Sequence, residues 1–341
     1  MAKRRKLVAT LEEVTREPAV RAVAASTVAA GGAIAAGLVR KRAADRQRRR
    51  RRRYRLRAGE TPSRGVGRIA RGQLDLTIEL LQREDAHGDG EAIHEARKAL
   101  KRLRALLRVS RGSLGDERYH SENVVLRDAG RELAGARDAQ VLVATLDGLT
   151  GRFNEELPPG AWPRFREALA GNVKPADAPS GGRRVGVVNT LSGARTRVAT
   201  WPLAQNRGPE SLLGGLEQIY RRGRRAAGVA SDRPSTENLH ELRKRAKDLW
   251  HATQLLRPVS PKRMKALSRR AHRLSDLLGD DHDLSVLLER ARAQPELFDP
   301  GELELLAALI KGRRKVLRRE ALARAARLYR RKPRKLVRRL A

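Results

Sequence analysis

The sequence contains no cysteine, and aromatic residues make up only 3% of its 341 residues. The missing cysteine excludes disulfides, thiolate metal sites and cysteine nucleophiles, and it is compatible with a reducing cytoplasm. The scarcity of aromatic residues disfavours sites that stack unpaired bases on rings. Strand-like stretches are also scarce, because only Val185–Val188 has that character. The sequence therefore predicts an all-α fold.

The chain has a large excess of basic over acidic residues. Lysine and arginine total 75 residues against 39 aspartates and glutamates, which leaves a formal net charge of +36. An imbalance of this size indicates an anionic partner. Part of it lies in a low-complexity extension, residues 1–60, whose arginine-rich segment Arg48–Arg57 should bind any polyanion, including weak binding of DNA or RNA.

The same extension contains an uncharged run of 18 residues, Ala22–Val39, followed by Arg40, Lys41 and Arg42. Its length and flanking charge fit a membrane anchor with its C-terminal side in the cytoplasm. Its alanines and glycines contribute little transfer free energy, so an Ala-rich helix or a disordered tail is the favoured alternative.

Beyond the extension, residues 61–340 show the periodicity of amphipathic helices. We expect a first helical half at 61–171 and a second at 211–340. The segment 172–210 between them is rich in proline, glycine, serine and asparagine, which predicts a connector.

One helical stretch occurs twice, at Ile93–Arg104 and at Leu239–Trp250. Each copy places His, Arg, Lys and Lys at positions i, i+3, i+4 and i+7, which share one face of a helix. Leucine, isoleucine and alanine occupy the opposite face, so each helix should be buried on one side and cationic on the other. The cationic residues are His94, Arg97, Lys98 and Lys101 in the first copy and His240, Arg243, Lys244 and Lys247 in the second.

The spacing of these landmarks indicates a duplication. His94 and His240 are 146 positions apart, and Asp138 and Asp283, each shortly after a leucine and a glycine, are 145 apart. A repeated helical unit can bring both cationic helices to one central interface. We therefore expect two pseudo-symmetric four-helix bundles with a basic groove between them.

At these residues the chain resembles the CHAD family, the conserved histidine α-helical domain. The first copy fits the family's motif almost throughout, and the second keeps all four cationic positions but has Trp250 where the family often has arginine. Arg137-Asp138 matches the first of the family's glycine-then-aspartate junctions, and His282-Asp283 replaces the more usual Asn-Asp at the second. The resemblance covers about Pro62–Leu340. It implies a non-enzymatic protein that binds inorganic polyphosphate in the central groove. We expect such a protein in the cytoplasm, with polyphosphate granules as a further expected location.

Polyphosphate presents repeated negative charge and no base edges, so it requires point charges along a groove. The eight residues of the two cationic faces are the main candidates for contact. Neighbouring arginines extend the set: Arg102, Arg104, Arg108, Arg224 and Arg225. His94 and His240 can donate to phosphate oxygens, and the alternative for both is a half-buried histidine bonded to a neighbouring helix.

The other polar residues near the motifs have less distinctive interpretations. Asp138 and Asp283 should cap the helix that follows each break, with metal ligation as the alternative. We expect His251 and His282 to be structural or to face solvent.

The sequence lacks the motifs that the enzymatic interpretations require. His240-Glu241-Leu242-Arg243 resembles the phospho-accepting box of sensor kinases, but Lys244-Arg245 follows it in place of Thr-Pro. Glu302-Leu303-Glu304 lacks the lysine of a triphosphate-tunnel strand. No catalytic residue, metal or cofactor is therefore assigned. Nonspecific nucleic-acid binding through the basic surface is the principal alternative function.

Overall fold

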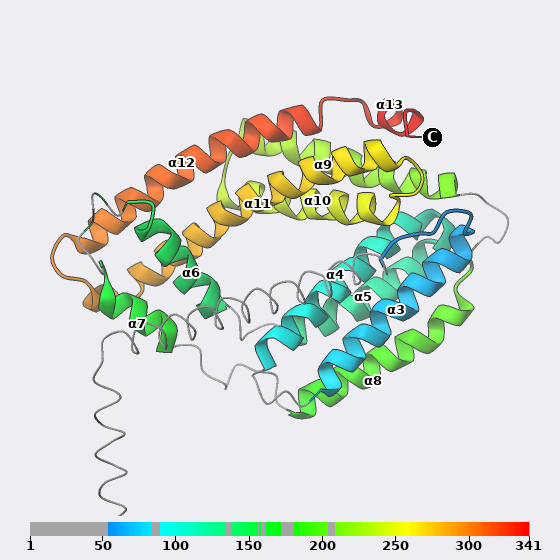
Figure 1. Ribbon diagram of the computed structural model, residues 1–341, viewed down its shortest axis with the longest axis horizontal. Coiled ribbons are helices and arrows are strands. Elements are labelled where there is room, and N and C mark those ends of the chain that lie inside the picture. Colours follow the sequence, from blue (N-terminus) through cyan, green and yellow to red (C-terminus); the bar gives the residue numbers. More distant parts are fainter. Residues whose placement is uncertain are drawn as a thin grey trace, which may run out of the picture. The chain divides into compact units, whose positions relative to one another are not determined.

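The computed structural model describes residues 54–83, 89–133, 138–153, 155, 157, 161–171, 181–203 and 209–340. Within these ranges the chain forms helices and no strand, as the sequence predicts (Figure 1). The arginine run before Tyr54, the uncharged run Ala22–Val39, Arg137 and the side chain of Asp138 lie outside the described residues.

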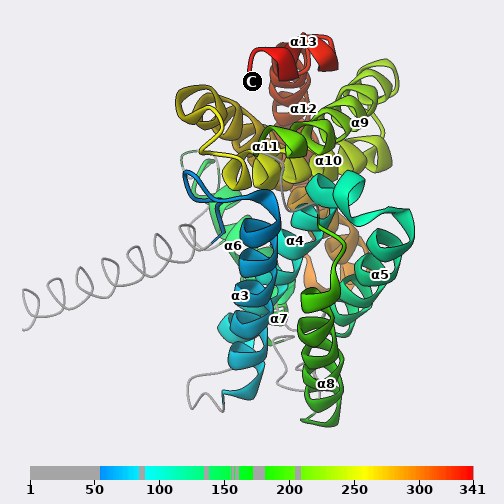
Figure 2. The ribbon, with the colours of Figure 1, turned by 90° about the vertical axis from the view of Figure 1, so that its right-hand side faces the viewer.

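Four helices form a first bundle: α3 (Pro62–Gln82), α4 (Asp89–Leu114), α5 (Asp116–Glu132) and α8 (Gly181–Arg197). Helices α3 and α5 each pack against both α4 and α8, which closes the bundle (Figure 2). Gly115 joins α4 to α5 with a φ of 77°, a left-handed conformation that glycine adopts without steric cost. The first cationic motif ends up in α4, whose apolar stripe is buried.

The position of α8 corrects our expectation for residues 172–210, which are more than a connector. Small and polar residues dominate the α8 sequence, but Val187, Leu191 and Ala194 recur at helical spacing and are buried. Packing of this narrow stripe against α3 and α5 outweighs the low helix propensity of its glycines and β-branched residues.

The later helices are α9 (Leu213–Asp232), α10 (Thr236–Leu255), α11 (Pro261–Arg292), α12 (Glu302–Leu328) and α13 (Pro333–Arg338). Helix α10 carries the second cationic motif, and its first turn is capped by the Ser235 hydroxyl, which accepts from the Asn238 backbone N–H at 3.2 Å. Helix α10 packs between α9 and α11, and α12 packs along α11. Short 3-10 turns occur at Val198–Thr200, Pro209–Leu212 and Pro295–Leu297.

Helix α11 runs without a break through Gly279, where the sequence suggested that one helix ends and another begins. The apolar spacing continues on both sides of the glycine, through Leu274, Leu278 and Leu284, and keeps the helix buried. Asp283 therefore lies inside α11 and caps nothing, which makes its predicted capping role wrong.

Helices α6 (Asp138–Thr150) and α7 (Pro163–Gly171) belong to the first half of the sequence but pack elsewhere. Helix α6 contacts α11 and α7. Together with the far halves of α11 and α12 they enclose a second apolar core that includes Leu146, Trp162, Phe165, Leu287 and Ile310. The division into 61–171 and 211–340 therefore does not match the packing.

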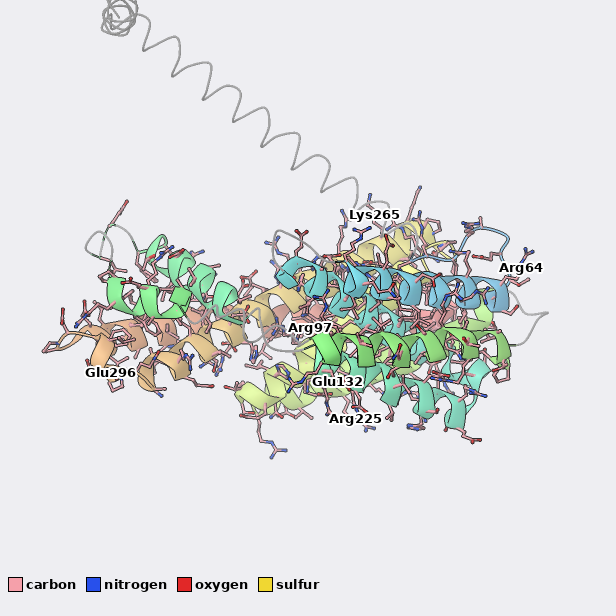
Figure 3. All side chains as sticks on the ribbon, turned by 90° about the horizontal axis from the view of Figure 1, so that it is seen from below. Arg64, Arg97, Glu132, Arg225, Lys265 and Glu296 are labelled. Atoms are coloured by element: carbon pink, nitrogen blue, oxygen red, sulfur yellow. The ribbon has the colours of Figure 1, made fainter. Side chains whose placement is uncertain are left out.

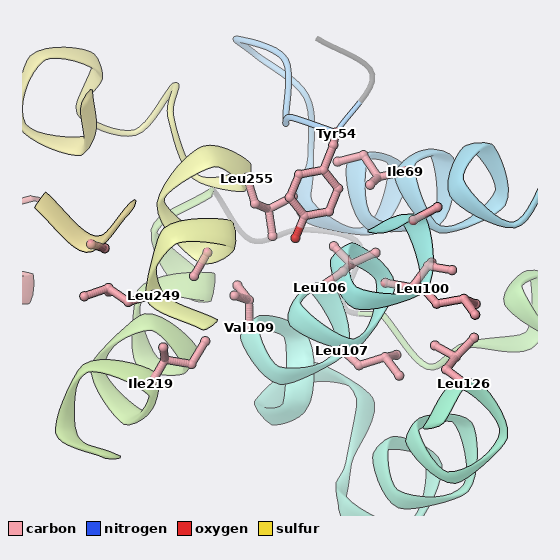
Figure 4. Packing of buried hydrophobic residues seen from close by; sticks show 14 of the residues in the cluster. Tyr54, Ile69, Leu100, Leu106, Leu107, Val109, Leu126, Ile219, Leu249 and Leu255 are labelled. Carbon is pink, nitrogen blue, oxygen red and sulfur yellow. The ribbon is translucent and has the colours of Figure 1, made fainter. Parts of the chain in front are cut away.

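The larger core extends across α4, α9 and α10, and includes Leu106, Ile219 and Leu249 (Figure 4). Tyr54 and Leu56 are fully buried in it, and the Leu56 N–H donates to the Leu255 carbonyl at 3.1 Å. The folded unit that contains the helices therefore includes residues 54–60, which the sequence assigned to the extension. Two apolar side chains in an otherwise basic segment were too short a signal to reveal this packing.

Candidate functional site

The cationic faces of α4 and α10 meet where the two helices cross. Lys101 and Lys247 occupy equivalent positions in the two copies of the motif, and they lie close enough to interact electrostatically. Burial, the neighbouring Arg243 and then Lys101 lower the pKa of Lys247 to about 8. We name Lys101, Arg243 and Lys247 the cationic cluster.

Acidic residues offset this positive charge only in part. Asp283 and Asp276 of α11 favour the charged form of Lys247, but their effect is smaller than that of Arg243 and Lys101. Among the described residues, Lys247, Arg243 and Arg97 have no carboxylate within ion-pair distance. Charge repulsion at the cluster is therefore a free-energy cost of the unliganded fold, and a bound anion would relieve it.

The lowered pKa predicts how stability depends on pH. Folding disfavours the charged form of Lys247, so between about pH 8 and its unfolded value of 10.5 the unfolded chain binds more protons. The free energy of unfolding should therefore rise as the pH rises from 7.5 to 9.5, by about 2 kcal/mol from this residue. Denaturant titrations of the wild type and Lys247→Met would measure it. An equal pH response of both proteins would contradict this origin.

The Arg243 guanidinium lies close to the backbone of α11 at Gly279. A Cβ atom at position 279 would lie 3.2 Å from the Arg243 Nη2 atom, and the Arg243 Nε atom is buried without a hydrogen-bond partner among the described atoms. The glycine that we read as a helix break instead makes room for the guanidinium. Ligand oxygens could satisfy its unused donor.

His240 and His282 form a ring pair beside the cluster, with their centroids 4.8 Å apart. Burial lowers the pKa of both, helped by Lys244 at His240 and by Arg243 at His282, so both rings are neutral at pH 7. Each Nδ1 atom is buried and has no partner among the described residues. His282 is thus paired with His240 at the site, and sequence reasoning missed this partnership. His94 is half-buried on α4.

Other predicted site residues have local partners. Lys98 pairs with Glu95 at 2.7 Å, and Lys244 pairs with Glu241 at 3.4 Å. The Lys98 and Lys244 side chains are 38% and 52% exposed, so solvent screens both pairs and leaves these lysines available to a ligand. Arg97 is half-buried on the same face of α4 (Figure 3).

The remaining arginines of α4 serve the packing. Arg108 donates to Asp248 of α10 at 3.0 Å, and both side chains are mostly buried, so this ion pair ties the two helices together. Arg104 donates to the Asn123 side chain of α5 at 3.1 Å, and Arg102 is buried. These contacts favour structural roles for all three. Asp248, which the motif gave no reason to select, is the missed residue here.

Arg224 and Arg225 are exposed on α9. Arg225 lines a depression of ≈ 390 Å³ between α9 and α10, together with Arg222 and Arg245. No residue of the cationic cluster lines this depression, so Arg225 belongs to a different part of the surface.

His251 is buried, which excludes the solvent-facing interpretation. Burial, then Arg102 and Lys247, lower the pKa of His251 to about 3, so the ring stays neutral. It contacts Tyr54 and Trp250, and Trp250 also stacks on His272 with centroids 4.2 Å apart. Trp250 therefore packs between two imidazoles.

Two further alternatives can be compared with the described residues. They contain no group of three histidine, aspartate or glutamate side chains that could hold a metal ion, so the alternative of metal ligation gains no support there. No helix in the same part of the chain has both the length and the apolar character of a membrane span.

A profile of the CHAD domain matches residues 68–292, which is well over half of the chain. The chain belongs to the CHAD family. The match includes α4, α10 and α11, and so every residue of the cationic cluster. The family assignment made from the two motifs is confirmed.

Similar proteins agree with this assignment. Two Mycobacterium tuberculosis proteins, named Uncharacterized protein MT2285 and Uncharacterized protein Rv2226, are each 29% identical over 248 residues. The aligned region is 67% of this chain but 45% of each relative, so the chain spans about half their length. The crystal structure of the CHAD domain from the plant Ricinus communis matches with a TM-score of 0.51 and 18% identity, covering 77% of this chain and 87% of that one. This second likeness supports the fold.

Proposed function

We propose that this CHAD protein binds inorganic polyphosphate at the cationic cluster without catalysing a reaction on it. The supporting observation is that Lys101 and Lys247, from the two copies of one motif, lie near Arg243. The positive charges of Arg243 and Lys101 lower the pKa of Lys247. A linear chain of phosphates would replace this repulsion with attraction along both helices. Membership of the CHAD family is consistent with such a ligand.

The flanking residues would extend the contact in both directions. Lys98 and Lys244 are screened by solvent, and Arg97 lies on the same face of α4 as Lys101. The His240 and His282 rings carry unused buried nitrogen atoms beside Arg243. A polyanion would raise the pKa of both histidines and give them donors toward phosphate oxygens. Localisation to polyphosphate granules would follow from this affinity.

Nonspecific nucleic-acid binding is the second candidate, because charged side chains cover the outer faces of the helices as well as the cluster (Figure 3). Duplex DNA needs only a general positive field, whereas the cluster presents charges in a fixed arrangement. Aromatic residues for stacking are few. These points favour polyphosphate.

Competition at one moderate salt concentration should separate the two candidates. We expect long-chain polyphosphate to remain bound to the full chain when duplex DNA is added at an equal concentration of phosphate. A variant with Arg48–Arg53 replaced by glutamines should lose DNA affinity while retaining polyphosphate affinity, because the cluster lies in the folded unit. Displacement of polyphosphate by DNA from both proteins would favour general basicity and reject the proposal.

A further inference from the structure

A cavity of ≈ 590 Å³ lies between α6, α11 and α12, the three helices that share the second apolar core. Its volume is in the range of small-molecule sites. Apolar side chains from all three helices line it, including Val141 and Leu149 of α6, Leu284 of α11 and Leu317 of α12. The proposed polyphosphate function makes no use of this cavity.

Four charged side chains also line this cavity. Asp280 and Asp283 come from consecutive turns of α11, Arg313 comes from α12, and Arg152 follows the end of α6. None of the four forms an ion pair or a side-chain hydrogen bond with another described residue. Arg152 and Asp280 are exposed and Asp283 and Arg313 are half-buried, so water can reach all four, and a ligand in the cavity could replace that water with complementary groups.

The two signs lie on different elements, which constrains the ligand. The carboxylates of Asp280 and Asp283 would accept from a protonated amine, and the guanidinium groups of Arg313 and Arg152 would donate to an acidic group. The leucine and valine side chains would contact an apolar body attached to the carbon that carries both groups. Burial, Asp283 and Asp276 together raise the pKa of Asp280, so a cation at this end would be stabilised.

We propose that the cavity binds a small zwitterion with an apolar body, the chemical class of free apolar amino acids, with its amine at Asp280 and Asp283 and its acidic group at Arg313 and Arg152. The cavity adjoins the cationic cluster, because Asp283 acts on Lys247 and Arg243 acts on Asp280. The proposal rests on the lining of the cavity and does not depend on polyphosphate binding.

Three ligands with the same phenylethyl body can test each half of the proposal. L-Phenylalanine carries both charged groups, 2-phenylethylamine lacks the acid, and 3-phenylpropanoate lacks the amine. Calorimetry or ligand-observed NMR with the full chain should show L-phenylalanine binding about tenfold more tightly than either of the others.

Substitutions of the acidic and of the basic lining residues should weaken the binding of different ligands. Asp280→Asn should weaken L-phenylalanine and 2-phenylethylamine by about tenfold and leave 3-phenylpropanoate unchanged. Arg313→Gln should weaken L-phenylalanine and 3-phenylpropanoate and leave 2-phenylethylamine unchanged. Such a crossover cannot arise from partial unfolding, which would weaken all three ligands together.

A blocking variant provides an independent test. Gly148 lines the cavity, and a Cβ atom added there would meet nothing within 4 Å, so the side chain of Gly148→Leu can start without a clash and should occupy part of the cavity. It should abolish binding of all three ligands, whereas Gly186→Leu on α8, which is equally unobstructed, should not. Circular dichroism would verify that both variants fold. Absence of saturable binding by the wild type at about 10 mM ligand, or unchanged binding by Gly148→Leu, would overturn the proposal.

Discussion

Replacing Lys101 and Lys247 together by glutamate is expected to weaken long-chain polyphosphate binding by about 100-fold or more, or about 3 kcal/mol. The substitution removes two charges that share one site and puts two negative charges in their place. Charge-assisted contacts with phosphate are among the strong polar interactions, and reversal adds repulsion to their loss. Isothermal titration calorimetry at fixed salt would measure the change in Kd.

A matched control separates the cluster from net charge. Lys262 and Lys265 are exposed on α11, and Lys265 lies away from Arg97 in Figure 3. Lys262→Glu with Lys265→Glu changes the net charge equally and should lower the affinity only slightly. Circular dichroism would verify that both double variants keep the helical fold. Equal losses of affinity in both double variants would show that overall charge is sufficient.

The two cationic helices were predictable because both of their signals are local. Apolar spacing fixed the buried side of each helix, and the histidine and lysine pattern therefore had to lie on the other. The repeat offset then predicted that Lys101 and Lys247 hold equivalent positions, and the structure places them together.

The errors arose where tertiary contacts determine the structure. Gly279 suggested a helix break, but it lies inside α11, where the buried side chains on both sides of it keep the helix continuous and the Arg243 guanidinium lies close to it. At the offset of the repeat, the single helix α11 corresponds to α5 and α6 together, so the same sequence signal has different outcomes in the two copies. The ion pair between Arg108 and Asp248 joins residues 140 positions apart, a distance over which sequence spacing carries no information. Pseudo-symmetry of the two bundles stays a prediction.

The cluster requires that α4 and α10 keep a fixed relative position, and α9 helps to set it. Helix α9 packs against both α4 and α10. Helix α9 approaches α4 closely at Gly215. A Cβ atom added at this residue would lie 2.0 Å from the carbonyl oxygen of Val109 and 2.7 Å from its carbonyl carbon. These are backbone atoms inside a helix, so no side-chain rotation can relieve the clash.

Gly215→Ala should therefore destabilise the protein by about 3 kcal/mol or more, because α9 must move away from α4 and expose the apolar contacts of Leu213 and Leu216. Gly214 is the natural control, since a Cβ atom there meets nothing within 4 Å. Gly214→Ala should leave the free energy of unfolding unchanged or raise it by up to about 1 kcal/mol. Urea unfolding followed by circular dichroism would compare the two variants. Equal stability would mean that α9 and α4 do not meet as closely as the structure shows, and the fixed crossing of α4 and α10 would lose its support.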